Sequence, residues 1–353
     1  MTSPTHLVSD ALPAIGLSPS QRAWLRFKAN RRGYISLWIF SFLFVLCSFA
    51  EVISNDKPLI VHYNNEFYFP VIHVYPETTF GGDFETEADY SDEYVRGLLT
   101  RGDNWMLEPL IPYSYNTINF TSALPNPAPP SSENYLGTDD RGRDVLARVI
   151  YGFRISVWFS LVLMVIGVLI GITMGAIQGY FSGRTDLIMQ RIIEVWSSMP
   201  ELYLLIIFAS IFQPSIWLLI ILLSLFGWMG LSDYVRAEFL RGRNLDYVRS
   251  ARAMGLSNWS IITRHLLPNS LTPVITFLPF RISGAILALT SLDFLGLGVP
   301  PTTPSLGELL AQGKENIEAW WLSMSAFVVL VGTLMLLIFI GEALREALDT
   351  RKT

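Results

Sequence analysis

Long apolar runs limit what this chain can fold into more than any other feature of its sequence. Four of them, each about 20 residues or longer, occupy residues 34–52, 155–181, 271–295 and 320–343. A helix of about 20 apolar residues spans the hydrocarbon core of a bilayer, where every backbone polar group needs a partner within the protein. Only 16% of the residues are charged, against about a quarter in soluble domains. We therefore expect an all-α membrane protein.

The charged residues are unevenly distributed, and their placement predicts which segments face the cytoplasm. Residues 1–33 carry five basic side chains against Asp10, and residues 233–269 carry six arginines against three acids. Residues 51–133, by contrast, carry thirteen acids against three basic side chains. Because short loops rich in Lys and Arg stay on the cytoplasmic side, we expect the basic segments inside and the acidic segment outside. The sequence gives no sign of a nucleic-acid partner.

A fifth apolar run, residues 202–230, decides the number of spans. As one span, it would place the arginine-rich segment on the same side as the acidic segment. As two spans, the first beginning near Asp186, it keeps both basic segments on one side. Pro214 supports a turn within the run, because proline lacks the backbone donor that a helix interior needs. The sequence thus predicts six transmembrane helices with both termini cytoplasmic.

Between the first and second spans no apolar stretch is long enough to cross a bilayer, so we expect a periplasmic insertion that ends in a proline-rich strut. The apolar side chains between residues 145 and 150 share one helical face, which predicts either a helix on the membrane surface or the first turns of the second span. Residues 48–50 also resemble a signal-peptide cleavage site, which is an alternative for the first span. The expected parts are a cytoplasmic N-terminal segment (1–33), transmembrane helix 1 (34–52), the insertion (53–152), a core of five helices (153–343) and a cytoplasmic tail (344–353).

The polar segment 233–269 has the pattern of helix, glycine, helix and proline. Gly255 can take the positive φ that ends a helix, Ser257 can cap the next helix, and Pro268 favours a stop. Two short helices at an angle would form a compact, positively charged elbow between two spans. Such an elbow suits the binding of a soluble partner, whereas the alternative is an ordinary basic loop.

This segment resembles the EAA loop of ATP-binding-cassette (ABC) importer permeases, whose pattern is Glu-Ala-Ala, three residues, Gly, nine residues and Ile-x-Leu-Pro. The positions that match it are Ala251, Gly255, Leu267 and Pro268. Arg249, Ser250 and His265 depart from it, so Arg249 is not expected to act as a carboxylate would. The resemblance implies that the matching residues belong to a coupling loop that docks in an ATP-binding subunit and carries its closure into the membrane.

Three further segments, residues 27–33, 136–146 and 294–301, resemble the dipeptide, oligopeptide and nickel branch of these importers. The acidic insertion looks most like that of the microcin-C-type peptide importer. This second resemblance depends on short matches at residues 68–70, 80–82, 88–90, 194–197 and 305–310. The two resemblances together imply a permease subunit that transports peptides. They leave open whether the natural cargo is a nutrient peptide or a peptide antibiotic of the microcin C type.

The resemblance also implies partners in the bacterial inner membrane. These are a homologous permease subunit, ATP-binding subunits, a periplasmic peptide-binding protein, the peptide substrate and membrane lipid. ATP and Mg²⁺ are expected on the partner subunits, because the only Gly-Lys pair, Gly313-Lys314, lacks the surroundings of a phosphate-binding loop. We expect no catalytic residue, cofactor or metal in this chain, since its four histidines are scattered.

Two competing functions come from other classes of protein. A secondary transporter acting without an ATPase would use ion-coupling acids near the midplane and interrupted helices in matching halves, and no such acid pair is evident. A membrane-anchored receptor that senses ligand through the insertion would need only one or two spans.

Arg281 lies well inside the run 271–295, where a charge is costly and usually faces a partner or a water-filled path. We expect Arg281 either to face the substrate path or to form a structural ion pair or an interfacial contact. A stripe of small residues at a spacing of four marks the second span: Gly167, Gly171, Gly175 and Gly179. The stripe predicts close helix packing, with a cargo-lining role as the alternative.

Overall fold

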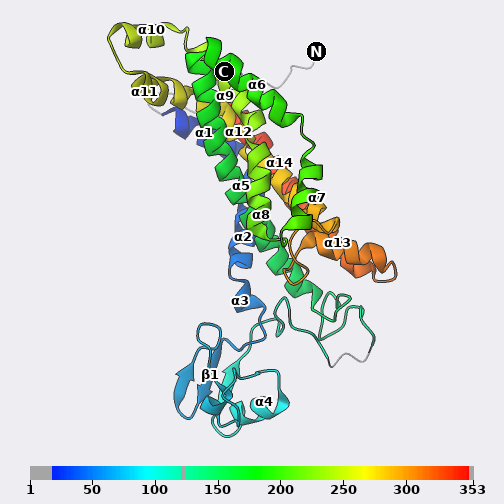
Figure 1. Cartoon of the computed structure of the whole chain (residues 1–353). Coiled ribbons are helices and arrows are strands. Elements are labelled where there is room, and N and C mark those ends of the chain that lie inside the picture. The colour runs from blue at the N-terminus through cyan, green and yellow to red at the C-terminus, as the bar shows by residue number, and fades with distance from the viewer. Residues whose placement is uncertain (1–17, 121–123, 350–353) are drawn as a thin grey trace, which may run out of the picture.

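The computed structural model describes residues 18–120 and 124–349. Its long helices form an elongated bundle, with α10 and α11 projecting at one end and the segment that contains β1 and α4 at the other (Figure 1). The helix α1 and the C-terminal end of α14 lie near the same end as α10 (Figure 1). The two ends of the bundle therefore differ in structure as they differ in charge.

Three helices form the N-terminal part: α1 (Pro19–Ala29), α2 (Arg31–Ser48) and α3 (Ala50–Ile53). Ser18 caps α1 in a capping box with Gln21, and the Asn30 side chain accepts a hydrogen bond from the backbone of Gly33. The helix α2 packs along α14 (Trp320–Leu348). Gly33 makes this approach close, because a Cβ atom there would lie 2.9 Å from the carbonyl oxygen of Phe339.

The insertion contains a three-stranded antiparallel sheet in the order β2-β1-β3. Its elements are β1 (Ile60–Tyr63), β2 (Glu66–Tyr68), the 3₁₀-helix η1 (Glu77–Phe80), α4 (Glu93–Leu99) and β3 (Trp105–Leu107). Asn64 and Asn65 both have positive φ and form the two-residue turn between β1 and β2. Val61, Phe80 and Leu99 are buried in a small core of its own. The prediction of an all-α protein is therefore wrong for this segment, although the rest is mostly helical.

The helix α5 (Val145–Phe181) is 37 residues long and begins ten residues before the predicted second span. Asp144 caps it through a 2.7 Å hydrogen bond from the backbone of Ala147. Val145 and Val149 are buried against Leu309 and Trp321. The residues from 145 to 150 are thus the first turns of α5 and not a separate helix on the membrane surface.

Three glycines of the α5 stripe, Gly171, Gly175 and Gly179, pack against α9 (Met229–Gly242). A Cβ atom at Gly171 would lie 3.0 Å from the Leu231 side chain, and one at Gly175 would lie 2.7 Å from Val235. No larger residue fits at these positions without displacing α9. The structure therefore confirms the packing role that the spacing predicts.

The apolar run around Pro214 breaks as predicted, between α7 (Glu201–Ile211) and α8 (Ile216–Gly227). The preceding helix, α6 (Gly183–Ser197), meets α7 at a bend of 65°. The side chain of Asp186 forms an ion pair with Arg236 that joins α6 to α9. The stretch that begins near Asp186 is thus a bent pair of helices.

The C-terminal part contains α12 (Leu267–Phe294), α13 (Leu306–Glu315) and α14. Among the described residues, four helical segments are long and apolar enough to cross a membrane, and the bent pair α6–α7 raises that number to five. The four are Val145–Phe181, Ile216–Gly242, Asn258–Phe294 and Trp320–Leu348. The expected first span is not among them, because α2 has 18 residues, begins with two arginines and is followed by a break at Phe49.

Candidate functional site

The first short helix of the elbow is α10 (Asp246–Ala253), and it ends as the sequence predicts. Gly255 has φ +78°, and the amide of Leu256 donates a 3.2 Å hydrogen bond to the carbonyl of Ala251. The amide of Gly255 donates a second bond, of 3.0 Å, to the carbonyl of Arg252. These two bonds form a Schellman motif, which satisfies carbonyls at the helix end and turns the chain away from it.

After this turn the chain enters a single long helical segment. Ser257 caps α11 (Asn258–Ser260), which continues through the π-helical segment η2 (Ile261–Leu266) into α12. The prediction that Pro268 ends the second elbow helix is wrong. Pro268 lies directly after the π-helical segment η2 inside this continuous helix, and an irregular turn of that kind accommodates a residue without an amide donor. One arm of the elbow is therefore continuous with an apolar span.

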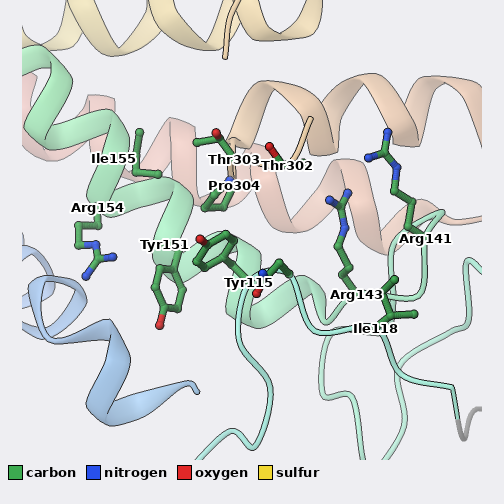
Figure 2. Close-up of a pocket in the computed structure, with 11 residues that line it drawn as sticks. Tyr115, Ile118, Arg141, Arg143, Tyr151, Arg154, Ile155, Thr302, Thr303 and Pro304 are labelled. Atoms are coloured by element: carbon green, nitrogen blue, oxygen red, sulfur yellow. The ribbon is translucent and has the colours of Figure 1, made fainter. Parts of the chain in front are cut away.

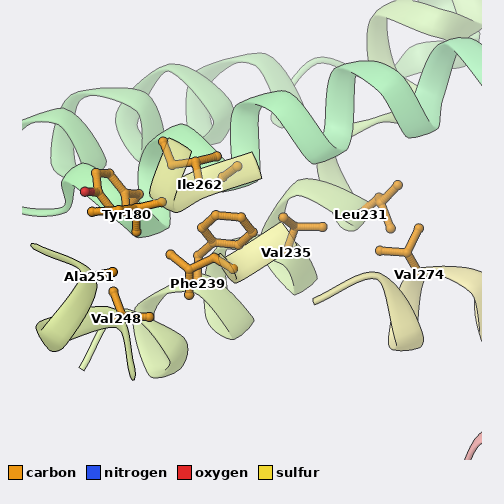
Figure 3. Packing of buried hydrophobic residues seen from close by; sticks show 11 residues of the cluster. Tyr180, Leu231, Val235, Phe239, Val248, Ala251, Ile262 and Val274 are labelled. Atoms are coloured by element: carbon orange, nitrogen blue, oxygen red, sulfur yellow. The ribbon is translucent and has the colours of Figure 1, made fainter. Parts of the chain in front are cut away.

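A buried cluster fixes the elbow to the helix bundle. Figure 3 shows Val248 and Ala251 of α10 directed towards Phe239 of α9 and Tyr180 of α5. Phe239 and Val248 are fully buried, and Leu267 packs against the same cluster from α12. A displacement of α10 cannot leave these close-packed neighbours unchanged.

Tyr180 joins the parts of this cluster, although the sequence reasoning did not single it out. Its hydroxyl group and the side-chain oxygen of Asn258 lie 2.7 Å apart in a hydrogen bond, and its carbonyl accepts one of 3.2 Å from Arg243. The guanidinium of Arg252 lies 5.5 Å from the centre of its ring. A tyrosine near the end of an apolar run carries no sequence signal for these contacts.

The outer surface of the elbow is both apolar and basic. Met254 is 74% exposed and Trp259 is 75% exposed, while Arg249 and Arg264 are also exposed. Large exposed apolar side chains beside cations are characteristic of protein-binding surfaces. Of the four residues that match the EAA pattern, Ala251 and Leu267 contact the buried cluster, whereas Gly255 and Pro268 are exposed.

Arg281 lies in the middle of α12 and borders a cavity of about 220 Å³. Its Nη2 donates a 2.5 Å hydrogen bond to the carbonyl of Gly227, the last residue of α8. Glu201 lines the same cavity. Within the described residues Arg281 forms no ion pair, so the expectation of a structural ion pair within this chain is not met there.

Near the β-sheet end of the bundle, four charged side chains form one largely buried network: Asp139 and Arg143 of the 136–146 motif, Arg148 of α5 and Glu308 of α13. Arg143 and Arg148 both contact Asp139 and Glu308, and the shortest contacts of Glu308 are 2.6 Å to Arg148 and 3.3 Å to Arg143. Arg148 and Asp139 are fully buried, and two cations balance two anions. Burial raises the pKa of the neighbouring Asp140, and the charge of Asp139 raises it further. This network joins the residue 136–146 motif to α13.

A cavity of about 420 Å³ lies beside this network, lined in part by two tyrosines and three arginines. Figure 2 shows Tyr115 and Tyr151 close together, with Arg141 and Arg143 on one side and Arg154 on the other. Arg154 is bound by Glu51 at 2.8 and 2.9 Å, and Arg143 is part of the buried network. Arg141 lies 4.0 Å from the carboxylate of Asp140, so each of the three cations already has a carboxylate partner. Among the described residues, no group of three or more His, Cys, Asp or Glu side chains could hold a metal ion.

Two segments of this chain match known protein families. Residues 147–353 match the family described as the binding-protein-dependent transport system inner membrane component. Residues 18–70 match the N-terminal transmembrane domain of oligopeptide transport permease C. The first match covers the elbow, the Arg281 cavity and the helices that hold them.

Curated relatives extend over nearly the whole chain. The inner membrane ABC transporter permease protein YejE of Escherichia coli (strain K12) is 52% identical over 337 residues, which cover 95% of this chain and 98% of the relative. The peptidoglycan transport system permease protein YejE of Agrobacterium fabrum is 49% identical over 360 residues, covering 95% and 93%. The oligopeptide transport system permease protein OppC of Haemophilus influenzae is 37% identical over 228 residues, covering 64% and 73%.

The helices and these matches define a multi-pass permease of the inner membrane, mostly helical, with four to five apolar spans among the described residues. The chain belongs to the family of inner membrane components of binding-protein-dependent transport systems. The predicted membership of the ABC importer permeases is thereby confirmed. These findings support that prediction and not the alternative of a secondary transporter acting without an ATPase.

Proposed function

We propose that this chain is one permease subunit of an ABC importer that moves peptides across the bacterial inner membrane by alternating access. The names of relatives from oligopeptide and dipeptide transport systems support a peptide cargo, and peptide antibiotics of the microcin C type belong to this proposal through the resemblance of the insertion. ATP and Mg²⁺ bind to partner subunits, a homologous permease completes the path, and a periplasmic peptide-binding protein delivers the substrate.

The proposed topology has six spans. They are α2, α5, the bent pair α6–α7, the pair α8–α9, the segment that ends in α12, and α14. Residues 1–33 and 344–353 are cytoplasmic, residues 53–152 form the periplasmic insertion, and the core 153–343 carries the coupling loop 233–269. Two observations support this: the elbow lies at the end of the bundle opposite the sheet (Figure 1), and the insertion is acidic while the elbow is basic.

The observation that carries the proposal is the buried cluster beneath the elbow. It joins α10 to α5, α9 and α12 through Val248, Phe239 and Tyr180. When the exposed residues Met254 and Trp259 bind an ATP-binding subunit, closure of that subunit displaces α10, and the cluster transmits the displacement to three helices of the bundle. Gly255 sets the angle between α10 and the segment that leads into α12.

The test is to purify the tagged chain from a bacterial membrane and to reconstitute the complex in vesicles. We expect ATP-binding subunits at stoichiometric amounts, and peptide uptake that requires both ATP and the binding protein. Uptake driven by an ion gradient without ATP-binding subunits would contradict the proposal. ATP-dependent uptake of a non-peptide cargo alone would remove the peptide assignment and leave the coupling mechanism in place.

A further inference from the structure

Among the described residues, the guanidinium of Arg281 has one hydrogen-bond partner, the carbonyl of Gly227. Gly227, whose carbonyl accepts from Nη2 at 2.5 Å, is the last residue of α8, and helix-end carbonyls carry partial negative charge without intrahelical donors. Gly167 of α5 leaves room for the group, since a Cβ atom there would lie 2.7 Å from Nη2. Three helices therefore position Arg281 and leave little freedom to its side chain.

The positive charge of Arg281 has no carboxylate partner in the part of the chain that the structure describes. Arg143, Arg148, Arg154 and Arg236 each form an ion pair there. The Nε atom of Arg281 is buried without a hydrogen-bond partner in the described residues. A cation inside a membrane segment is costly and is kept where it meets an anion or a water-filled path. Within the described part of the chain, the guanidinium of Arg281 therefore has a donor, Nε–H, that is free to bind an anionic group.

The cavity beside Arg281 can receive such a group. Its volume is about 220 Å³, and its walls include Leu163, Leu223 and Ala285. Glu201 lines the cavity without pairing with Arg281. Apolar walls lower the local dielectric, so an anion that enters the cavity is attracted to the guanidinium more strongly than it would be in water.

A peptide carries one anionic group whatever its sequence, which is its C-terminal carboxylate. The planar guanidinium of arginine matches a carboxylate through two parallel hydrogen bonds. We propose that Arg281 binds the C-terminal carboxylate of the transported peptide inside the membrane and so selects for a free C-terminus. This inference depends on the proposed peptide cargo. It explains how one fixed charge serves peptides with different side chains.

The test compares two forms of one peptide, with a free C-terminal carboxylate and with a C-terminal amide. The reconstituted importer, with its binding protein and ATP-binding subunits, is assayed for ATP-dependent uptake of each. Wild type is expected to favour the free carboxylate by roughly tenfold to a hundredfold, the range of a charge-assisted hydrogen bond. The variant Arg281→Gln should transport both forms at the low rate of the amide. The variant Arg281→Lys should keep part of the preference, because lysine keeps the positive charge but cannot form the two parallel hydrogen bonds of a guanidinium.

The matched control is Arg191→Gln, since Arg191 is an exposed arginine of α6 outside the cavity. It should retain the full preference. Because every variant uses the same binding protein, a change in the preference between variants reports on the permease. An equal loss of both peptides in Arg281→Gln would overturn the inference and indicate a partner carboxylate from another subunit. Transport of neither form by wild type would instead overturn the proposed function, and with it this inference.

Discussion

The turn at Gly255 offers a graded test of the coupling mechanism, because its conformation is defined and its surroundings are open. Gly255 has φ +78°, and a Cβ atom there would meet nothing within 4 Å. Substitution by a larger residue therefore changes the backbone energy of the turn without creating a clash. The amide of Gly255 is engaged as well, in its 3.0 Å bond to Arg252.

The three substitutions differ in cost for this reason. Gly255→Ala places an ordinary L residue in the left-handed region, at a cost of roughly 1–2 kcal/mol, which is a factor of about 5–30 in the population of the turn. Gly255→Asn costs less, because Asn tolerates this region. Gly255→Pro cannot reach a positive φ and loses the amide donor, at a cost of about 3 kcal/mol or more. The expected order of coupling is Gly, Asn, Ala and then Pro.

The assay counts ATP molecules hydrolysed per peptide transported by the reconstituted importer, with membrane insertion measured separately. Gly255→Pro should insert normally and hydrolyse ATP with little transport. Gly183→Ala is the control, because Gly183 also has positive φ and open space but lies outside the elbow. Normal coupling in Gly255→Pro, or equal losses in Gly255→Asn and Gly255→Pro, would refute the reasoning.

Two further variants test the packing. Gly175→Val should lower the stability of the detergent-solubilised protein by about 1–3 kcal/mol through overpacking against Val235, which is measured as a lower melting temperature. The control is Gly332→Val, which should melt as wild type does because a Cβ atom there meets nothing within 4 Å. Equal melting temperatures of the two variants would contradict the packing role. Arg148→Met should destabilise by about 3–5 kcal/mol, because it leaves the fully buried Asp139 and the partly buried Glu308 with one cation fewer. The exposed Arg141→Met should cost little, and a neutral Arg148→Met would show that the network adds no stability.

Local chemistry made part of the fold predictable. Pro214 ends α7 because proline has no amide donor, and Gly255 ends α10 because glycine accepts positive φ. The local sequence does not determine the start of α5, because residues 145–150 have the same pattern in a surface helix as in the first turns of a span. Pro268 does not stop the helix, because the π-helical segment directly before it accommodates a residue without an amide donor.

Contacts between distant segments could not be predicted from the sequence. Arg148 and Glu308 are 160 positions apart, and nothing in the sequence around either residue indicates that the two form a pair. The three-stranded sheet in the insertion has strands of three or four residues, which are too short for a clear alternating pattern. The sequence identifies Arg281 as a charge within a span, but its contact with Gly227 depends on where α8 ends.

The location of the elbow is the most direct test of the whole account. Cys47 is the only cysteine of the chain and is buried, so a chain with Cys47→Ala and Trp259→Cys carries one thiol, at a position that is 75% exposed in the wild-type protein. We expect a membrane-impermeant thiol reagent to label it in inside-out vesicles stripped of ATP-binding subunits, and expect protection when those subunits are bound. Labelling from outside intact cells would contradict the account.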